Sequence, residues 1–150
     1  MSETIANTKK VGYYMRSDPI CVERTTSIEE ILKIFRNQQI SHVLVVEDHK
    51  LIGLISKEDL LQDLIEFGEE TTGQTLNQIH LHLTQAHLIM SEDLITLKEN
   101  DHRDFAMELL LQGQFHSLPV VDEQGKPIGI ITALDLLKGY YETLQKMSAS

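Results

Sequence analysis

Two short segments of this chain share a pattern of residue types suited to holding a polyol or an anion. Ser56 is followed three positions later by Asp59, and Thr132 is followed in the same way by Asp135. Each pair comes after a glycine and a short apolar run typical of a strand, and each precedes a Leu-Leu pair that can open a helix. A helix N-terminus offers unpaired N–H groups and the positive end of the helix dipole. A hydroxyl and a carboxylate placed there form a candidate ligand site.

The same residues also fit a purely structural interpretation. A hydroxyl residue followed three positions later by an acid is a capping pattern, in which both side chains satisfy the first turn of a helix. Because Asp is shorter than Glu or Gln, we expect it to reach back to the cap N–H less well. Taken alone, the motif favours capping, and the two roles do not exclude each other.

Composition and charge restrict the class of protein. The 150 residues are 41% apolar and 24% charged, as in one globular domain or two small ones that share a core. The net charge is -10 and no basic run of five residues occurs, which argues against a nucleic-acid partner. No apolar run spans a membrane and residues 1–10 lack a signal-peptide core, so we predict a cytoplasmic protein without membrane contact. The single cysteine, Cys21, excludes an internal disulfide framework, and we expect it to be buried.

The chain contains an internal repeat. Met15 matches Met90 and Ile40 matches Phe115 at an offset of 75 residues, which becomes 76 where Gly53 matches Gly129. One extra residue in a turn near Gly125 accounts for the change, because a loop accommodates an insertion at little cost. The two halves therefore have the same order of elements.

Periodicity predicts those elements. Ser27 and Glu30 form a capping box for a helix whose apolar residues fall at helical spacing. Residues 43–46 and 51–55 form a hairpin around a polar turn at 47–50, and a helix follows from Lys57 to about Phe67. Between the halves we expect a loop over 67–75 and a helix over 76–89. The histidines of that helix, His80, His82 and His87, lack metal-ligand spacing, so we predict no metal site.

The repeated motifs together resemble a tandem pair of cystathionine-beta-synthase (CBS) domains, also called a Bateman module. The resemblance rests on Met15 and Met90, on the strands beginning Ser41-His42-Val43 and His116-Ser117-Leu118, and on the two segments from Gly53 to Asp59 and from Gly129 to Asp135. It places one repeat at residues 10–66 and the other at 85–145, with a loop and helix at 67–84 between them. It implies an α/β fold of two β-α-β-β-α repeats related by a pseudo-twofold axis, with three-stranded sheets face to face and helices outside.

The resemblance also implies a ligand and its contacts. Members of the family bind adenosine-containing ligands such as AMP, ADP, ATP, S-adenosylmethionine or cyclic di-AMP in clefts between the repeats. The ribose hydroxyls would be held by Ser56, Asp59, Thr132 and Asp135. The base would lie against Pro19, Ile20 and Val22 in one site and against Ile95 and Leu97 in the other, although Val22 and Leu97 fit a core role better. Candidate phosphate contacts are His42, His116, Lys57, Arg16 and Arg103.

These expectations lead to two hypotheses about function. The first is a regulatory module that binds an adenosine nucleotide and acts in trans on an unidentified protein target. The alternative is a dimerisation or interaction subunit of an enzyme or transporter that binds no ligand. We predict no catalytic residues and no cofactor, because no catalytic triad order or phosphate-binding glycine loop occurs. We expect a homodimer formed through helices such as 57–67 and 134–144, the second of which contains Tyr140 and Tyr141.

Overall fold

The computed structural model describes residues 8–70 and 74–148, which belong to two compact units. The terminal unit combines the segment up to Pro19 with the segment from Ile95 onward, and the central unit comprises Ile20–Leu94. Each unit therefore contains a segment from the beginning of the other sequence repeat. The repeat boundaries at 10–66 and 85–145 describe the duplication in sequence and stay a prediction.

Each unit is built on one three-stranded sheet. In the central unit the strand order is β2 (Cys21–Glu23), β3 (His42–Glu47) and β4 (Lys50–Ser56), with β2 parallel to β3 and β3 antiparallel to β4. In the terminal unit the order is β1 (Arg16–Ser17), β6 (Pro127–Thr132) and β5 (Ser117–Val121), with both pairings antiparallel.

Two isolated bridges show that the units have the same arrangement of segments. Leu97 pairs in parallel with Val120 of β5, as β2 pairs with β3, and Ser91 pairs antiparallel with Leu54 of β4, as β1 pairs with β6. The first strand of the β-α-β-β-α order implied for the second repeat is thus reduced to a single bridge at Leu97.

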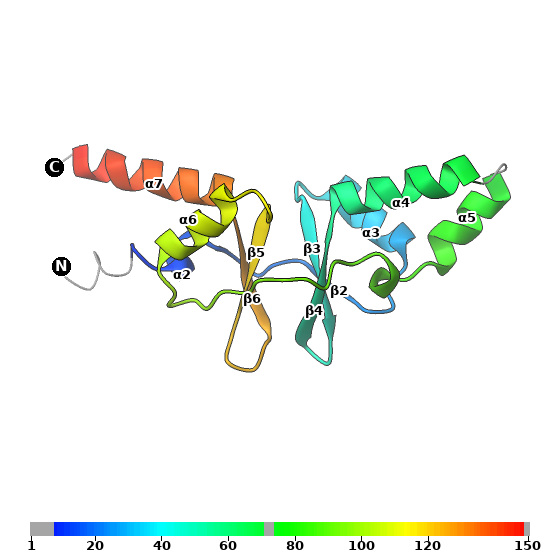
Figure 1. Ribbon diagram of the computed structural model, residues 1–150, viewed down its shortest axis with the longest axis horizontal. Coiled ribbons are helices and arrows are strands. Elements are labelled where there is room, and N and C mark those ends of the chain that lie inside the picture. Colours follow the sequence, from blue (N-terminus) through cyan, green and yellow to red (C-terminus); the bar gives the residue numbers. More distant parts are fainter. Residues whose placement is uncertain (1–7, 71–73, 149–150) are drawn as a thin grey trace. The chain divides into compact units, whose positions relative to one another are not determined.

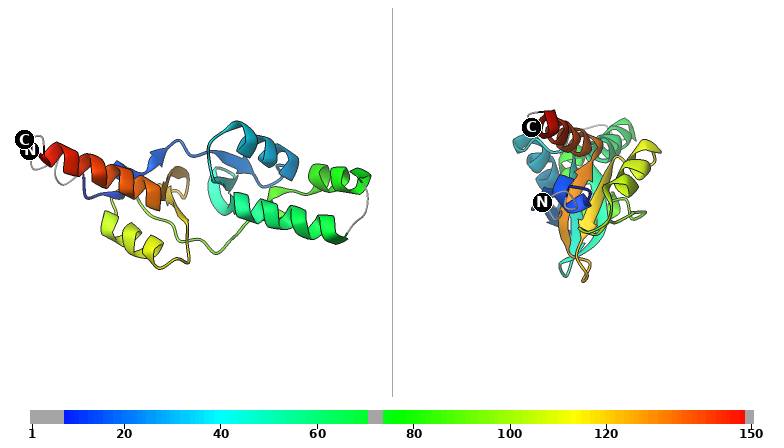
Figure 2. Two further views of the ribbon diagram at one scale, coloured as in Figure 1. Left: turned by 90° about the horizontal axis from the view of Figure 1, so that it is seen from above. Right: turned by 90° about the vertical axis from the view of Figure 1, so that its left-hand side faces the viewer.

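The helices of each unit lie on one face of its own sheet (Figures 1 and 2). Those of the central unit are α3 (Ile28–Asn37), α4 (Lys57–Glu70), α5 (Gln74–Leu83) and the 3₁₀ helix η1 (Ala86–Leu88). Those of the terminal unit are α2 (Val11–Tyr14), α6 (Arg103–Leu111) and α7 (Ala133–Ser148). The predicted α/β class with two three-stranded sheets is confirmed.

The two hairpins differ in their turns, as the repeat offset predicts. Asp48 and His49 form the two-residue loop between β3 and β4, and both have positive φ values, 51° and 67°. The loop between β5 and β6 is longer and contains Gly125 at φ 83°. Both hairpins have a register shift at the same place, between Val45 and Val46 and between Val120 and Val121. The extra residue therefore changes the turn and leaves the paired strands alike.

Local signals place the helix starts well. Ser27 caps α3, where its Oγ accepts a hydrogen bond of 3.3 Å from the Glu30 N–H, as predicted. Ile28, Ile31 and Phe35 lie on the buried face of this helix.

The prediction of one helix over 76–89 was wrong. Helix α5 ends at Leu83 because the backbone then pairs with the segment before α3: the Thr84 carbonyl accepts from the Ile28 N–H, and the Ala86 N–H donates to the Thr26 carbonyl. The loop predicted over 67–75 was also partly wrong, since α4 continues to Glu70 and α5 begins at Gln74. Residues 71–73 of that loop and residues 1–7 lie outside the described residues.

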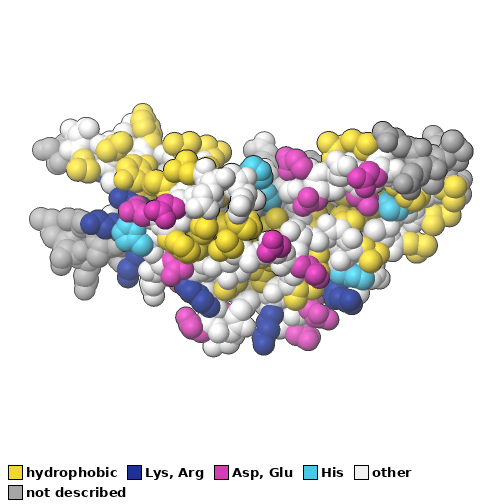
Figure 3. Space-filling model, in the orientation of Figure 1, with side chains coloured by type: hydrophobic (Ala, Val, Ile, Leu, Met, Phe, Trp, Pro, Cys, Tyr) yellow, Lys and Arg dark blue, Asp and Glu magenta, His cyan; other side chains and the backbone are white. Residues whose placement is uncertain are grey.

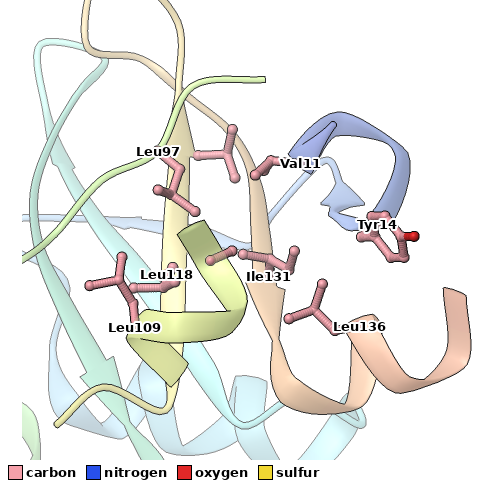
Figure 4. Packing of buried hydrophobic residues seen from close by; sticks show 9 residues of the cluster. Val11, Tyr14, Leu97, Leu109, Leu118, Ile131 and Leu136 are labelled. Carbon is pink, nitrogen blue, oxygen red and sulfur yellow. The ribbon is translucent and has the colours of Figure 1, made fainter. Parts of the chain in front are cut away.

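Each unit has its own hydrophobic core. Val11, Leu97, Leu118 and Ile131 are fully buried in the terminal unit, where α2, the Leu97 segment and both strands of the hairpin meet (Figure 4). Ile28, Ile31, Val43 and Ile55 have the corresponding role in the central unit. Full burial of one such side chain contributes about 1.5–3 kcal/mol.

Cys21 is exposed, so the expectation of a buried cysteine was wrong. The alternation of strand β2 directs Val22 into the core and leaves Cys21 and Glu23 on the other face. Even so, crowding by neighbouring atoms desolvates the thiol and raises its pKa, and the Glu23 carboxylate raises it further. The thiol is therefore a weak nucleophile at neutral pH.

Candidate functional site

The two predicted hydroxyl–carboxylate pairs both lie where a strand passes directly into a helix. Ser56 is the last residue of β4, and α4 begins at the next residue. The Ser56 N–H donates to Asp59 Oδ2 at 3.1 Å, and the Asp59 N–H donates to Ser56 Oγ at 3.0 Å. This reciprocal pair holds the carboxylate within the first turn of α4.

The terminal unit repeats this geometry at the junction of β6 and α7. Asp135 Oδ2 accepts from the Thr132 N–H and from the Thr132 hydroxyl, both at 2.9 Å, and the Asp135 N–H donates to Thr132 Oγ1 at 3.3 Å. Asp was expected to reach back to the cap N–H less well than Glu or Gln, but in both junctions it accepts from that N–H. Because the cap residue still belongs to the strand, its N–H points toward the first turn, and the short side chain reaches it.

The two junctions differ in charge. Arg16 Nε donates to Asp135 Oδ1 at 3.0 Å, and this ion pair joins β1 to the start of α7. Asp135 is buried, with 7% of its surface exposed, whereas Asp59 is half-buried and has no cationic partner among the described residues. One carboxylate is thus neutralised within the unit and the other is not.

The repeated glycines and methionines have a packing role. A Cβ atom at Gly53 would collide with the Met90 side chain, and one at Gly129 would collide with the Met15 side chain. In each unit a methionine therefore packs on the glycine in the second strand of the hairpin: Met90 packs on Gly53 of β4, and Met15 packs on Gly129 of β6. This contact explains why Met and Gly occur together in both repeats.

Strand pairing brings one phosphate candidate to the central junction. His42 lies opposite Ser56 in the pairing of β3 with β4, so the two side chains share one face of the sheet. Lys57 is exposed at the first position of α4. In the terminal unit His116 is exposed just before β5.

Sequence reasoning missed Ser117. This residue lies opposite Thr132 in the pairing of β5 with β6, as His42 lies opposite Ser56. It is 6% exposed, and its hydroxyl has no hydrogen-bond partner among the described residues. The repeat offset, which matches His42 with Ser117, was the signal that pointed to it.

The two terminal nitrogens of Arg103 make structural contacts. Its Nη1 donates to the Tyr14 hydroxyl at 2.7 Å and to the Thr8 carbonyl at 3.1 Å, and its Nη2 donates to the Tyr140 hydroxyl at 3.1 Å. The guanidinium also lies over the Tyr140 ring, 4.5 Å from its centroid. Burial lowers the pKa of this group, but the hydrogen bond with Tyr14 and the nearby charges raise it by more, so the net direction is upward. These contacts join α2, α6 and α7 and argue against a role in phosphate binding.

The residues predicted to lie against the base fall into two groups by burial. Val22 and Leu97 belong to the cores of their units, with 6% and 0% of their surface exposed. Pro19, Ile20 and Ile95 are only partly buried. The core role that the sequence favours for Val22 and Leu97 agrees with this burial.

Among residues 8–70 and 74–148, no group of three or more His, Cys, Asp or Glu side chains is placed to hold a metal ion. No helix within the same residues is long and apolar enough to cross a membrane.

The fold and the paired junctions define a duplicated α/β module. Residues 11–66 and 86–142 each match the CBS domain family, and the chain belongs to that family.

The chain is also similar to individual curated proteins. The chain is 33% identical over 141 residues to the chloroplastic CBS domain-containing protein CBSX1 of Arabidopsis thaliana, an alignment that covers 81% of this chain and 60% of CBSX1. It is 27% identical over 135 residues to inosine-5′-monophosphate dehydrogenase of Thermoplasma acidophilum, and this alignment covers 90% of this chain but 24% of the enzyme. The chain thus spans about three-fifths or less of the length of these curated relatives.

A solved structure matches the fold closely. The crystal structure of CBSX2 in complex with AMP superposes with a TM-score of 0.74 at 26% identity, and covers 90% of this chain and 98% of that one.

Proposed function

We propose that this protein is a regulatory module that binds an adenosine-containing ligand, with Ser56 and Asp59 in one site and Thr132 and Asp135 in the other. The repeated junction supports the proposal most directly, because it holds a hydroxyl and a carboxylate beside a helix N-terminus twice in one chain. A carboxylate can accept from both hydroxyls of a vicinal diol, and charge-assisted hydrogen bonds are roughly twice as strong as neutral ones. The capping bonds use one oxygen of Asp59, so its other oxygen can accept a diol.

The resemblance to the AMP complex of CBSX2 supports an adenine nucleotide as the ligand class. AMP, ADP and ATP are the first candidates, and S-adenosylmethionine and cyclic di-AMP are the next. His42 and Lys57 lie close to the Ser56 junction in the sheet and the sequence, and would contact a phosphate there. The apolar contacts to the base would come from Pro19 and Ile20 in one site and from Ile95 in the other.

Calorimetry and thermal unfolding with this ligand panel test the proposal. The change is the double substitution Asp59→Asn with Asp135→Asn, which removes both charges but keeps an oxygen that can cap each helix. The control is Asp93→Asn with Glu123→Gln, two exposed acids, one in each unit. We expect one ligand to stabilise the wild type and the control but not the double variant. Stabilisation that survives the double substitution would refute ribose binding by these carboxylates.

The module would act in trans on a protein target, without catalysis of its own, and we retain the cytoplasm as the proposed location. A ligand changes such a target only if it binds one conformation of the module better than another.

A second function, as a dimerisation or interaction subunit, is favoured by an apolar groove of about 550 Å³ on the terminal unit. Its lining includes Leu111, Leu137 and Tyr141, which are 80%, 67% and 62% exposed, and Figure 3 shows hydrophobic side chains gathered over α6 and α7. Light scattering tests this function. A mass near twice the chain mass of 17.1 kDa, reduced to that mass by Leu137→Glu, is expected for a homodimer. A monomer at micromolar concentration would contradict self-association through this groove.

A further inference from the structure

We infer that Arg16 makes the Thr132–Asp135 site selective for a ligand that carries an anionic group beside its diol. The Ser56–Asp59 site, where His42 and the exposed Lys57 are the candidate phosphate contacts, would discriminate less between neutral and anionic nucleosides. This inference rests on the proposed function. It concerns the difference between the two sites, which the repeated motifs by themselves do not show.

The difference arises at equivalent positions of the two units. Arg16 of β1 pairs with Ile130 on one side of β6, and Ser91 pairs with Leu54 on the corresponding side of β4. The residue at this position is therefore an arginine in the terminal unit and an exposed serine in the central unit. Only the arginine can pair with the carboxylate at the junction beside it.

The Arg16–Asp135 ion pair penalises a neutral ligand. Oδ2 of Asp135 already accepts two hydrogen bonds from Thr132, and Oδ1 accepts from Arg16. A neutral diol must compete with a cation for this buried carboxylate. It replaces an ion pair, in which both groups are charged, with hydrogen bonds in which only the carboxylate is charged.

The same arginine favours an anionic ligand. Its side chain is 47% exposed and contacts Asp135 through Nε. Within residues 8–70 and 74–148 its two terminal nitrogens make no hydrogen bond, so they are available to an incoming group. A guanidinium presents five donors in a rigid fork that suits phosphate. It can keep one bond to Asp135 while it binds an anion on the ligand. The affinity gained from the anion then offsets the competition for the carboxylate.

Ser117 adds unused polar capacity to the terminal site. Its buried hydroxyl has no partner among the described residues and lies across the strand pair from Thr132. Leaving a buried hydroxyl unpaired is unfavourable, so a polar ligand atom that reaches it gains more than it would in water. The central site has His42 at this position instead.

Calorimetric titration with AMP and with adenosine tests the inference. Asp59→Asn leaves the terminal site for measurement, and Asp135→Asn leaves the central site. In the Asp59→Asn background we expect AMP to bind at least about tenfold more tightly than adenosine, the factor that one charge-assisted bond supplies. Adding Arg16→Gln should lower that ratio to the value measured at the central site, by weakening AMP and strengthening adenosine. Arg24→Gln, at an exposed arginine, is the matched control.

The reciprocal variant guards against misfolding of Arg16→Gln. Ser91→Arg in the Asp135→Asn background should give the central site the preference for AMP over adenosine. If both ligands bind and neither Arg16→Gln nor Ser91→Arg changes the ratio, the inference is overturned while the proposed function stands. If neither AMP nor adenosine binds the Asp59→Asn variant, the inference is overturned, and the proposed function fails as well only if no other ligand of the panel binds the wild type.

Discussion

Replacing Arg103 by methionine tests whether its guanidinium holds three helices of the terminal unit together. Methionine keeps an unbranched apolar stem but removes the donors to Tyr14 and Tyr140. Tyr14 is 5% exposed as a residue, so water has little access to replace the lost donor. Each hydrogen bond to a charged group contributes about 1.5–3 kcal/mol, and a cation–π contact at a partly exposed site about 0.5–1 kcal/mol. Packing of the methionine recovers part of this, so we expect a net loss of about 2–4 kcal/mol.

Urea denaturation followed by circular dichroism measures this loss as a lower transition midpoint at unchanged slope. In a thermal scan, a loss of this size lowers the Tm of a chain of this length by roughly 5–15 °C. Arg24→Met is the matched control, because Arg24 is exposed, and we expect its stability to change by less than about 0.5 kcal/mol.

The ligand titration separates a structural role from a binding role. If the contacts with the two tyrosines are structural, Arg103→Met binds AMP with the affinity of the wild type at a temperature where it is folded. A variant that unfolds like the control would refute the stabilising network. A variant of normal stability that no longer binds AMP would show that Arg103 is a ligand contact instead.

Three further predictions concern packing and reactivity. Gly53→Ala should destabilise the protein by about 1–3 kcal/mol in urea denaturation, because the new Cβ meets the Met90 side chain. Adding Met90→Ala to this variant should restore part of the lost stability. The absence of any restoration would contradict the contact between Gly53 and Met90. Leu118→Ala should lower the free energy of unfolding by about 2–5 kcal/mol in the same measurement, because Leu118 is fully buried. Leu111→Ala, at an 80% exposed position, should lower it by less than about 0.5 kcal/mol. Equal losses of stability in the two variants would contradict the assigned core. Alkylation of Cys21 by iodoacetamide should go to completion without denaturant, because Cys21 is exposed. The alkylation rate should rise at a higher pH than that of free cysteine, because desolvation and a nearby carboxylate raise the thiol pKa. A rate that rises at lower pH would show a depressed pKa instead.

Features that depend on residues close together in the chain could be predicted from the sequence. The Ser27 cap, the paired strands of each hairpin and the extra residue near Gly125 were all predictable, because capping, strand alternation and turn geometry act over a few positions. The duplication was visible for the same reason: it repeats these local signals at a constant offset.

The tertiary structure decided which segments meet. Strand β1 pairs with β6, and that pairing brings Arg16 to Asp135 across 119 positions of sequence, which no local pattern indicates. The early end of α5 and the exposure of Cys21 follow in the same way from backbone pairing with another segment and from the face that a short strand turns inward. The hydroxyl–carboxylate motif is alike in both repeats, but its charge is not, because Arg16, which pairs with Asp135, comes from the other repeat, and the equivalent residue in the central unit is Ser91.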